Sequence, residues 1–179
     1  MIKRLFKGFA WAKRLEDERG EVLVELAMCA TLLIILAFGT IEFSQMLLVH
    51  QTMAGLTRQG SSLASRGTTL PDTMSALVAQ GASLNIATNG RIFVTEVADI
   101  NNAPQIINQV ESPSGIAAAS AVGTGIGNPA TMPSSARSIL QAGQAIYVTE
   151  VFYTYSPMTP VGSFLNKSLA STFYEAAYF

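Results

Sequence analysis

The chain has 179 residues, of which only 13% are charged, and its formal net charge is −1. Its mean hydropathy of +0.34 is high for a water-soluble domain of this size, which favours association with a membrane or a partner. The charge is uneven, because residues 1–20 carry a net charge of +3 and residues 21–179 a net charge of −4. The main body therefore lacks the basic surface that binding to a nucleic acid requires.

Cys29 and His50 are the only cysteine and the only histidine of the chain. A disulfide within the chain is excluded, and a metal centre would need several converging ligands. The sequence contains neither a GxSxG nor an HExxH motif, and Cys29 lies inside an apolar run, away from any aqueous active site. We therefore expect no catalytic residue, no metal, no cofactor and no enzymatic activity.

The apolar run comprises residues 22–41, in which Glu25 is the only charged side chain. At 1.5 Å per residue these twenty residues would span roughly 30 Å as a helix, the thickness of the hydrocarbon core of a bilayer. A buried core helix is the alternative, but a chain this small has little interior to cover a helix that is apolar all round. Basic residues precede the run, so we expect a single span in the lipid bilayer with a cytoplasmic N-terminus.

Gly20 stands between the charged tract and the apolar run, and Glu25 is the fifth residue after the bond that follows Gly20. This pattern resembles the type IV prepilin signature, in which a membrane-bound aspartic peptidase cuts after the glycine. Glycine lets the backbone enter a protease site in an extended form, and a carboxylate inside a bilayer calls for a partner. The resemblance implies that Gly20 and Glu21 form the processing site. It also implies that Glu25 pairs with the new N-terminal amine of a neighbouring subunit; the alternative is that Glu25 only reaches the headgroups.

Residues 18–27, together with the run FGTIEF at 38–43, are similar to the TadE-like family. Leu26 stands where that family usually has an aromatic residue, and Glu21 is an acidic residue at the first mature position. The resemblance implies a minor pilin or pseudopilin of a tight-adherence, Flp-type pilus, with a methylated new N-terminus as an accompanying modification.

The same resemblance implies three kinds of protein partner. These are a prepilin peptidase, other pilin-like subunits contacted through the N-terminal helix, and the pilus assembly platform of the inner membrane. The expected location is the bacterial inner membrane, with the C-terminal domain in the periplasm or outside the cell, or else the pilus fibre itself.

Beyond the apolar run, apolar residues recur at helical spacing, and Gly67 is the expected end of this helix. The resulting stripe should pack on the exported domain or on a sister helix. A second helix is expected from Thr73 to Leu84, with Asp72 as its N-cap. The apolar stripe comprises Phe43, Met46, Leu47, His50, Met53, Ala54, Thr57, Gly60, Leu63 and Ala64.

Four later segments, 91–100, 105–111, 145–155 and 171–179, have the composition of strands. Segments 92–97 and 146–151 resemble each other, which suggests neighbouring strands with Glu96 and Glu150 in similar solvated settings. Tyr147, Tyr153 and Tyr155 share one face by their spacing, and we expect that face to be packed. A short helix is expected at 136–141.

The predicted fold class is α+β, with a long transmembrane helix that continues into an amphipathic helix packed on a small antiparallel sheet. The expected divisions are a basic cytoplasmic leader at 1–20, the helix at 21–66 and an exported domain at 67–179. Residues 112–135, rich in Gly, Ala and Ser, are expected to form an exposed loop. The alternative function is an uncleaved, membrane-tethered binding or sensory module.

Overall fold

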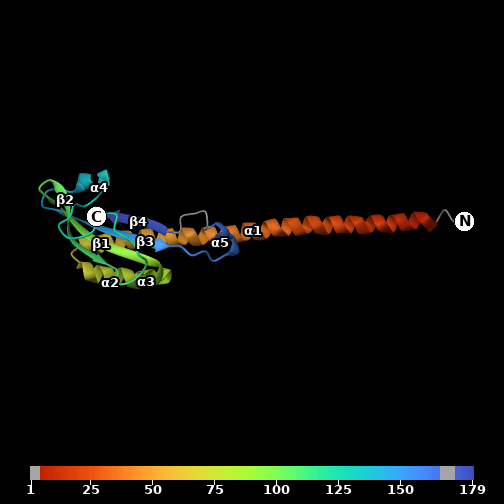
Figure 1. Ribbon diagram of the computed structural model, residues 1–179, viewed down its shortest axis with the longest axis horizontal. Helices are drawn as coiled ribbons and strands as arrows, with labels where there is room; N and C mark the ends of the chain where they lie inside the picture. The colour runs from red at the N-terminus through yellow and green to blue at the C-terminus, as the bar shows by residue number, and fades with distance from the viewer. Residues whose placement is uncertain (1–4, 166–171) are drawn as a thin grey trace.

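The computed structural model describes residues 5–165 and 172–179, with side chains described from Gly20 to Phe164 and from Thr172 onward. A single helix of 61 residues, α1 (Leu5–Ser65), runs through the basic N-terminal segment and the apolar run into the C-terminal domain. At 1.5 Å per residue it is about 90 Å long. Its N-terminal half projects away from the rest of the protein (Figure 1). The helix therefore begins well before residue 21, where we expected it to start.

The C-terminal end of α1 lies where the sequence predicted it. Gly67 has a φ of +91°, which favours glycine. Its N–H donates to the Ala64 carbonyl at 3.0 Å, and the Thr68 N–H donates to the Leu63 carbonyl at 3.2 Å. These two bonds form a Schellman motif, which satisfies carbonyls at the end of the helix.

The C-terminal part contains a four-stranded antiparallel sheet in the order β2-β1-β3-β4, which confirms the α+β fold class. Asn101 and Asn102 join the first two strands with φ values of 56° and 64°, as a two-residue hairpin turn with positive φ at both positions requires. The strands are β1 (Gly90–Ile100), β2 (Ala103–Glu111), β3 (Ala145–Thr154) and β4 (Thr172–Tyr178). The shorter helices are α2 (Leu70–Gln80), the 3₁₀ helix η1 (Gly81–Leu84), α3 (Ile86–Asn89), α4 (Ser134–Ile139) and α5 (Pro160–Leu165).

Helix α2 begins earlier than predicted, and its N-cap is Thr69 rather than Asp72. The Thr69 hydroxyl accepts from the Asp72 N–H at 3.3 Å and donates to the Asp72 carboxylate at 2.6 Å. Pro71 is tolerated because the first turn of a helix needs no backbone donor. Asp72 is therefore a first-turn residue that supports the cap.

Helix α1 packs on the sheet face that carries the tyrosines of β3. Tyr153 is buried there as expected, in a core with Met53 and Leu56 of α1. The predicted stripe of α1 was partly wrong, because Phe43 and Leu47 are exposed. Met46 and Val49, from the same stretch of helix, pack on the core, so Phe43 and Leu47 lie on a side of α1 that the rest of the protein does not cover.

His50 was also assigned to that stripe, and it too lies at the surface. Its side chain is 60% exposed, with Nδ1 at 3.9 Å from a Glu175 carboxylate oxygen. At this exposure the pair contributes little to stability. The structure thus gives His50 no special setting.

Two small residues of α1 bring the helix onto the sheet backbone. Ser61 donates its hydroxyl to the Ala177 carbonyl at 2.8 Å and accepts from the Thr149 N–H at 2.9 Å. Thr149 and Ala177 are cross-strand partners in β3 and β4, so the Ser61 hydroxyl inserts into their ladder. Gly60 permits this approach, because a Cβ there would lie 2.6 Å from the Thr149 hydroxyl oxygen.

We expect Gly60→Ala to lower the free energy of unfolding by about 1–3 kcal/mol, since the added methyl would overpack against Thr149 and Leu77. The matched control is Gly55→Ala on the same helix, where a Cβ would meet nothing within 4 Å. That change should stabilise the helix by up to about 1 kcal/mol. Thermal unfolding of the full chain in detergent checks the pair; equal melting temperatures for both variants would contradict this packing.

The other face of the sheet is covered by the connection between β2 and α4. Residues 112–133 contain no helix or strand, and most of their side chains are exposed. Val122, however, is fully buried against Val97 and Ile106. A segment that we expected to be exposed along its whole length thus closes a second small core.

Glu150 fastens this loop to the sheet. Its side chain is fully buried and accepts hydrogen bonds from the Ser120 hydroxyl, the Ala121 N–H (2.8 Å) and the Tyr174 hydroxyl (3.0 Å). Burial, together with the nearby Glu150 carboxylate, raises the pKa of Tyr174, so this phenol remains a donor at neutral pH. Three donors compensate for the loss of water around the Glu150 side chain.

The expected likeness between Glu96 and Glu150 was wrong. The two strands are neighbours, but they are antiparallel, and their register places Tyr147 opposite Glu96 and Phe93 opposite Glu150. The two carboxylates therefore lie on opposite faces of the sheet. They do not form a pair for acid–base chemistry.

We expect Glu150→Ala to lower the free energy of unfolding by about 3 kcal/mol, because three buried or half-buried donors lose their acceptor. The control Glu96→Ala removes a carboxylate that accepts one hydroxyl bond, from Tyr147 at 3.2 Å, and should cost about 1 kcal/mol or less. Urea unfolding of the full chain, followed by near-ultraviolet circular dichroism, measures both. An equal loss for the two variants would show that Glu150 does not hold the loop.

Candidate functional site

The predicted processing residues lie on a surface of α1 that touches no other described element. Gly20, Glu21 and Glu25 line one shallow groove along the helix, together with Val24, Met28 and Cys29. A Cβ added at Gly20 would meet nothing within 4 Å. The glycine is therefore not required by the packing of the described chain, and its role must be sought in another interaction.

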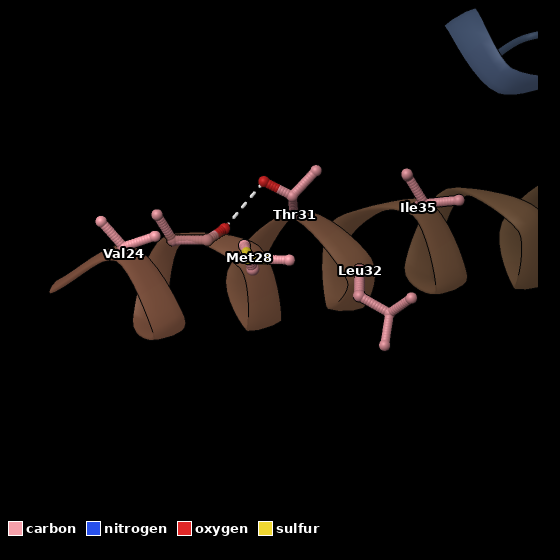
Figure 2. Close-up of a pocket in the computed structure, with 6 residues that line it drawn as sticks. Val24, Met28, Thr31, Leu32 and Ile35 are labelled. Carbon is pink, nitrogen blue, oxygen red and sulfur yellow. Dashed lines mark hydrogen bonds between the residues drawn. The ribbon is translucent and has the colours of Figure 1, made fainter. Parts of the chain in front are cut away.

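The apolar part of α1 satisfies its own polar groups. The Thr31 hydroxyl donates to the Ala27 carbonyl one turn earlier at 2.8 Å, and the Thr40 hydroxyl does the same to Leu36 (Figure 2 shows the first of these). Such back-bonding leaves an apolar surface, as a helix in hydrocarbon requires. Figure 2 also shows Val24, Met28, Leu32 and Ile35 along the same stretch of helix.

The segment Gly20–Ser65 is long and apolar enough to cross a membrane, with a mean hydropathy of 2.5 in its most apolar window. None of that window is buried against the rest of the described chain. A core helix would be covered by other elements, so this exposure agrees with a single membrane span. Large apolar side chains such as Leu33, at 64% exposed, face outward all along it.

Glu25 is the exception on this surface. Its side chain is exposed on α1, and within residues 20–164 and 172–179 no side chain donates a hydrogen bond or forms an ion pair with it. A carboxylate at the edge of an apolar helix is costly in a bilayer unless it finds a partner or reaches the headgroups. The geometry thus leaves Glu25 available to a group from outside the described chain.

A second carboxylate, Glu42, follows directly after the apolar run and is only 5% exposed. Its oxygens accept from the Tyr155 hydroxyl at 2.5 Å, the Thr159 hydroxyl at 2.7 Å and the Thr159 N–H at 3.1 Å. Burial and the Glu42 carboxylate raise the pKa of Tyr155, which therefore stays protonated and donates at physiological pH. We call Glu42, Tyr155, Thr159 and Gly162 the Glu42 network.

Helix α5 is shaped to approach this carboxylate. The Thr159 hydroxyl that donates to Glu42 also accepts from the Gly162 N–H at 3.0 Å, so it caps the helix. A Cβ at Gly162 would lie 2.5 and 2.7 Å from the two Glu42 oxygens, a space that only glycine leaves free. The network therefore ties the C-terminal domain to α1 at the point where the apolar run ends.

Glu42 was not among the predicted site residues, although it lies within the FGTIEF run. Its partners Tyr155 and Thr159 are 113 and 117 residues away in the chain. The available signal was the carboxylate itself, placed one residue after the apolar run, where a charge has to be solvated or paired.

Residues 20–62 match the family model described as TadE-like protein. This match confirms the resemblance that the sequence suggested, and it covers Gly20, Glu25, Glu42 and the Gly60-Ser61 contact. No curated protein and no solved structure matches the chain. The matched residues all lie within α1, and the sheet lies outside the match.

Proposed function

We propose that this TadE-like chain is a minor pilin or pseudopilin that a prepilin peptidase cuts between Gly20 and Glu21. After the cut, α1 remains in the bacterial inner membrane and associates with the helices of other pilin-like subunits and with the inner-membrane assembly platform. The observation that carries the proposal is the spacing of Gly20 and Glu25 at the start of a membrane-length helix, inside the TadE-like match.

Three features of the described chain support this assignment. Gly20 and Glu21 lie on a free surface of α1, where a protease could reach them once the local helix opens. Glu25 has an exposed carboxylate that is available to pair with a group from another subunit. The exported domain is attached to α1 by the Glu42 network and the Ser61 contacts, so that a moving helix carries the domain with it.

We expect the chain isolated from its native membranes to begin at Glu21, as determined from its intact mass. In the variant Gly20→Ala the uncut form should accumulate at least about tenfold, because a methyl group obstructs the extended backbone in the peptidase site. The variant should fold normally, since a Cβ at position 20 contacts nothing. The control is Gly39→Ala, another open position of α1. Wild-type protein that keeps residues 1–20 in cells containing the peptidase would refute the processing step.

The alternative function, an uncleaved membrane tether for a binding or sensory domain, is favoured by two observations. Helix α1 runs without interruption from Leu5 through Gly20, and Glu21 and Leu26 depart from the usual family pattern. If this reading is correct, Gly20→Ala has no effect on the mass of the mature protein or on pilus assembly. The same mass measurement thus separates the two functions.

A further inference from the structure

Helix α5 and the loop before it expose apolar side chains in an uncharged setting. The sequence has no charged residue from Val151 to Asn166. Phe164 is 77% exposed and Met158 is 73% exposed, more than any other large apolar side chain among the described residues, those of the membrane span included. In water, two such side chains close together in the chain would be left without cover.

The position of α5 along α1 indicates what covers them. The apolar run ends at Ile41, and the next residue, Glu42, lies against Thr159, which directly precedes α5, and against Gly162 of α5. In Figure 1, α5 lies beside α1 on the side of the sheet that faces the projecting half of the helix. Helix α5 is therefore the part of the exported domain that lies where α1 leaves the bilayer.

A third exposed side chain occurs at this level. Phe43 directly follows Glu42 on α1 and is 68% exposed. Glu42 itself is turned into its hydrogen-bond network, so it does not place a free charge at this surface. Aromatic and other apolar side chains on a short uncharged segment suit the boundary between lipid headgroups and acyl chains.

We propose that Phe164 and Met158, together with Phe43, insert into the outer headgroup–acyl boundary of the bilayer that α1 crosses. The exported domain then contacts the membrane at two places, through α1 and through α5. The Glu42 network fixes α5 at the required depth, and the two contacts together set the orientation of the sheet relative to the bilayer. This inference rests on the proposed membrane span and is independent of cleavage after Gly20.

The test uses tryptophan fluorescence of the full chain in phosphatidylcholine vesicles at a low protein-to-lipid ratio. Trp11→Phe removes the only native tryptophan. Three variants then carry one tryptophan each: Phe164→Trp on α5, Leu33→Trp within the span, and Ile126→Trp as the matched exposed control. Ile126 is 70% exposed. The next residue, Gly127, donates its N–H to the Ile106 carbonyl, which places this control near the β1–β2 turn. The C-terminal end of β3, from which the chain continues to α5, lies at the end of the sheet opposite to the β1–β2 turn. The control and Phe164 are therefore at opposite ends of the sheet.

Lipids with brominated acyl chains quench a tryptophan that lies in the bilayer. We expect Phe164→Trp to be quenched most by bromines near the carbonyl end of the chain, Leu33→Trp by bromines near the methyl end, and Ile126→Trp by neither. Quenching of Leu33→Trp without quenching of Phe164→Trp would overturn the inference and leave the span intact. Absence of quenching at Leu33→Trp would overturn the span itself. A blue shift of Phe164→Trp that grows with protein per vesicle, without lipid quenching, would assign the surface to a second copy and also overturn the inference.

Discussion

Replacement of Glu25 by alanine is expected to leave the chain inserted, folded and cut, but to reduce the pilus fibre recovered by shearing by about tenfold or more. The side chain is exposed on α1 and supports no contact within the described chain, so its loss does not disturb the fold. In the apolar surroundings of the span its carboxylate is the one charge that can attract the terminal amine of another subunit. Even about 1.4 kcal/mol lost at such a contact lowers the association constant about tenfold.

The control for this experiment is Thr31→Ala, also in the span. Thr31 already bonds the Ala27 carbonyl within its own helix, so its removal takes no group away from a partner. The variant Glu25→Asp keeps the negative charge on a side chain that is one methylene shorter. It should restore part of the fibre yield. Full piliation by Glu25→Ala, in cells where the mature N-terminus is still found at Glu21, would refute the pairing role and favour the interpretation in which Glu25 only reaches the headgroups.

Much of the fold was predictable, because it depends on local patterns. The helix end at Gly67 and the turn between β1 and β2 need residues that tolerate positive φ, and Gly67, Asn101 and Asn102 supply them. The strands followed from their β-branched and aromatic composition. What could not be predicted was which side of α1 is covered, since Phe43 is apolar yet exposed, whereas Met46 and Val49 pack on the core.

In the candidate site too, contacts between residues close together in the sequence were predictable, and contacts between distant residues were not. Gly20, Glu21 and Glu25 are close together in the sequence, so their placement on one face of a helix could be foreseen. The Glu42 network and the buried position of Glu150 depend on partners that only the tertiary fold brings near, such as Tyr155 and Ser120. A single sequence shows that a carboxylate follows an apolar run, but it does not show which distant hydroxyl will bond to it.

Replacement of Glu42 by alanine is expected to detach α5 from α1 while the sheet remains folded. Three hydrogen bonds, from Tyr155 and from two groups of Thr159, lose their acceptor together, at a cost on the order of 3 kcal/mol. Amide hydrogen exchange followed by mass spectrometry should then show about a hundredfold loss of protection in a peptide covering α5. A peptide from β1 should keep its protection, because β1 pairs with β2 and β3 and does not contact Glu42.

The control Tyr155→Phe removes one of the three donors. It should lower the hydrogen-exchange protection of α5 about tenfold or less.

The pH dependence of the Glu42 network gives a second check. A tyrosine whose pKa is raised in the folded protein stabilises the fold fully below its unfolded pKa, about 10, and loses this contribution only as the pH rises through the folded value. The Tyr155 contribution should therefore be unchanged between about pH 6 and pH 9. Equal protection of α5 in Glu42→Ala and wild type would mean that apolar contacts alone hold α5, and that the carboxylate next to the membrane span has another task.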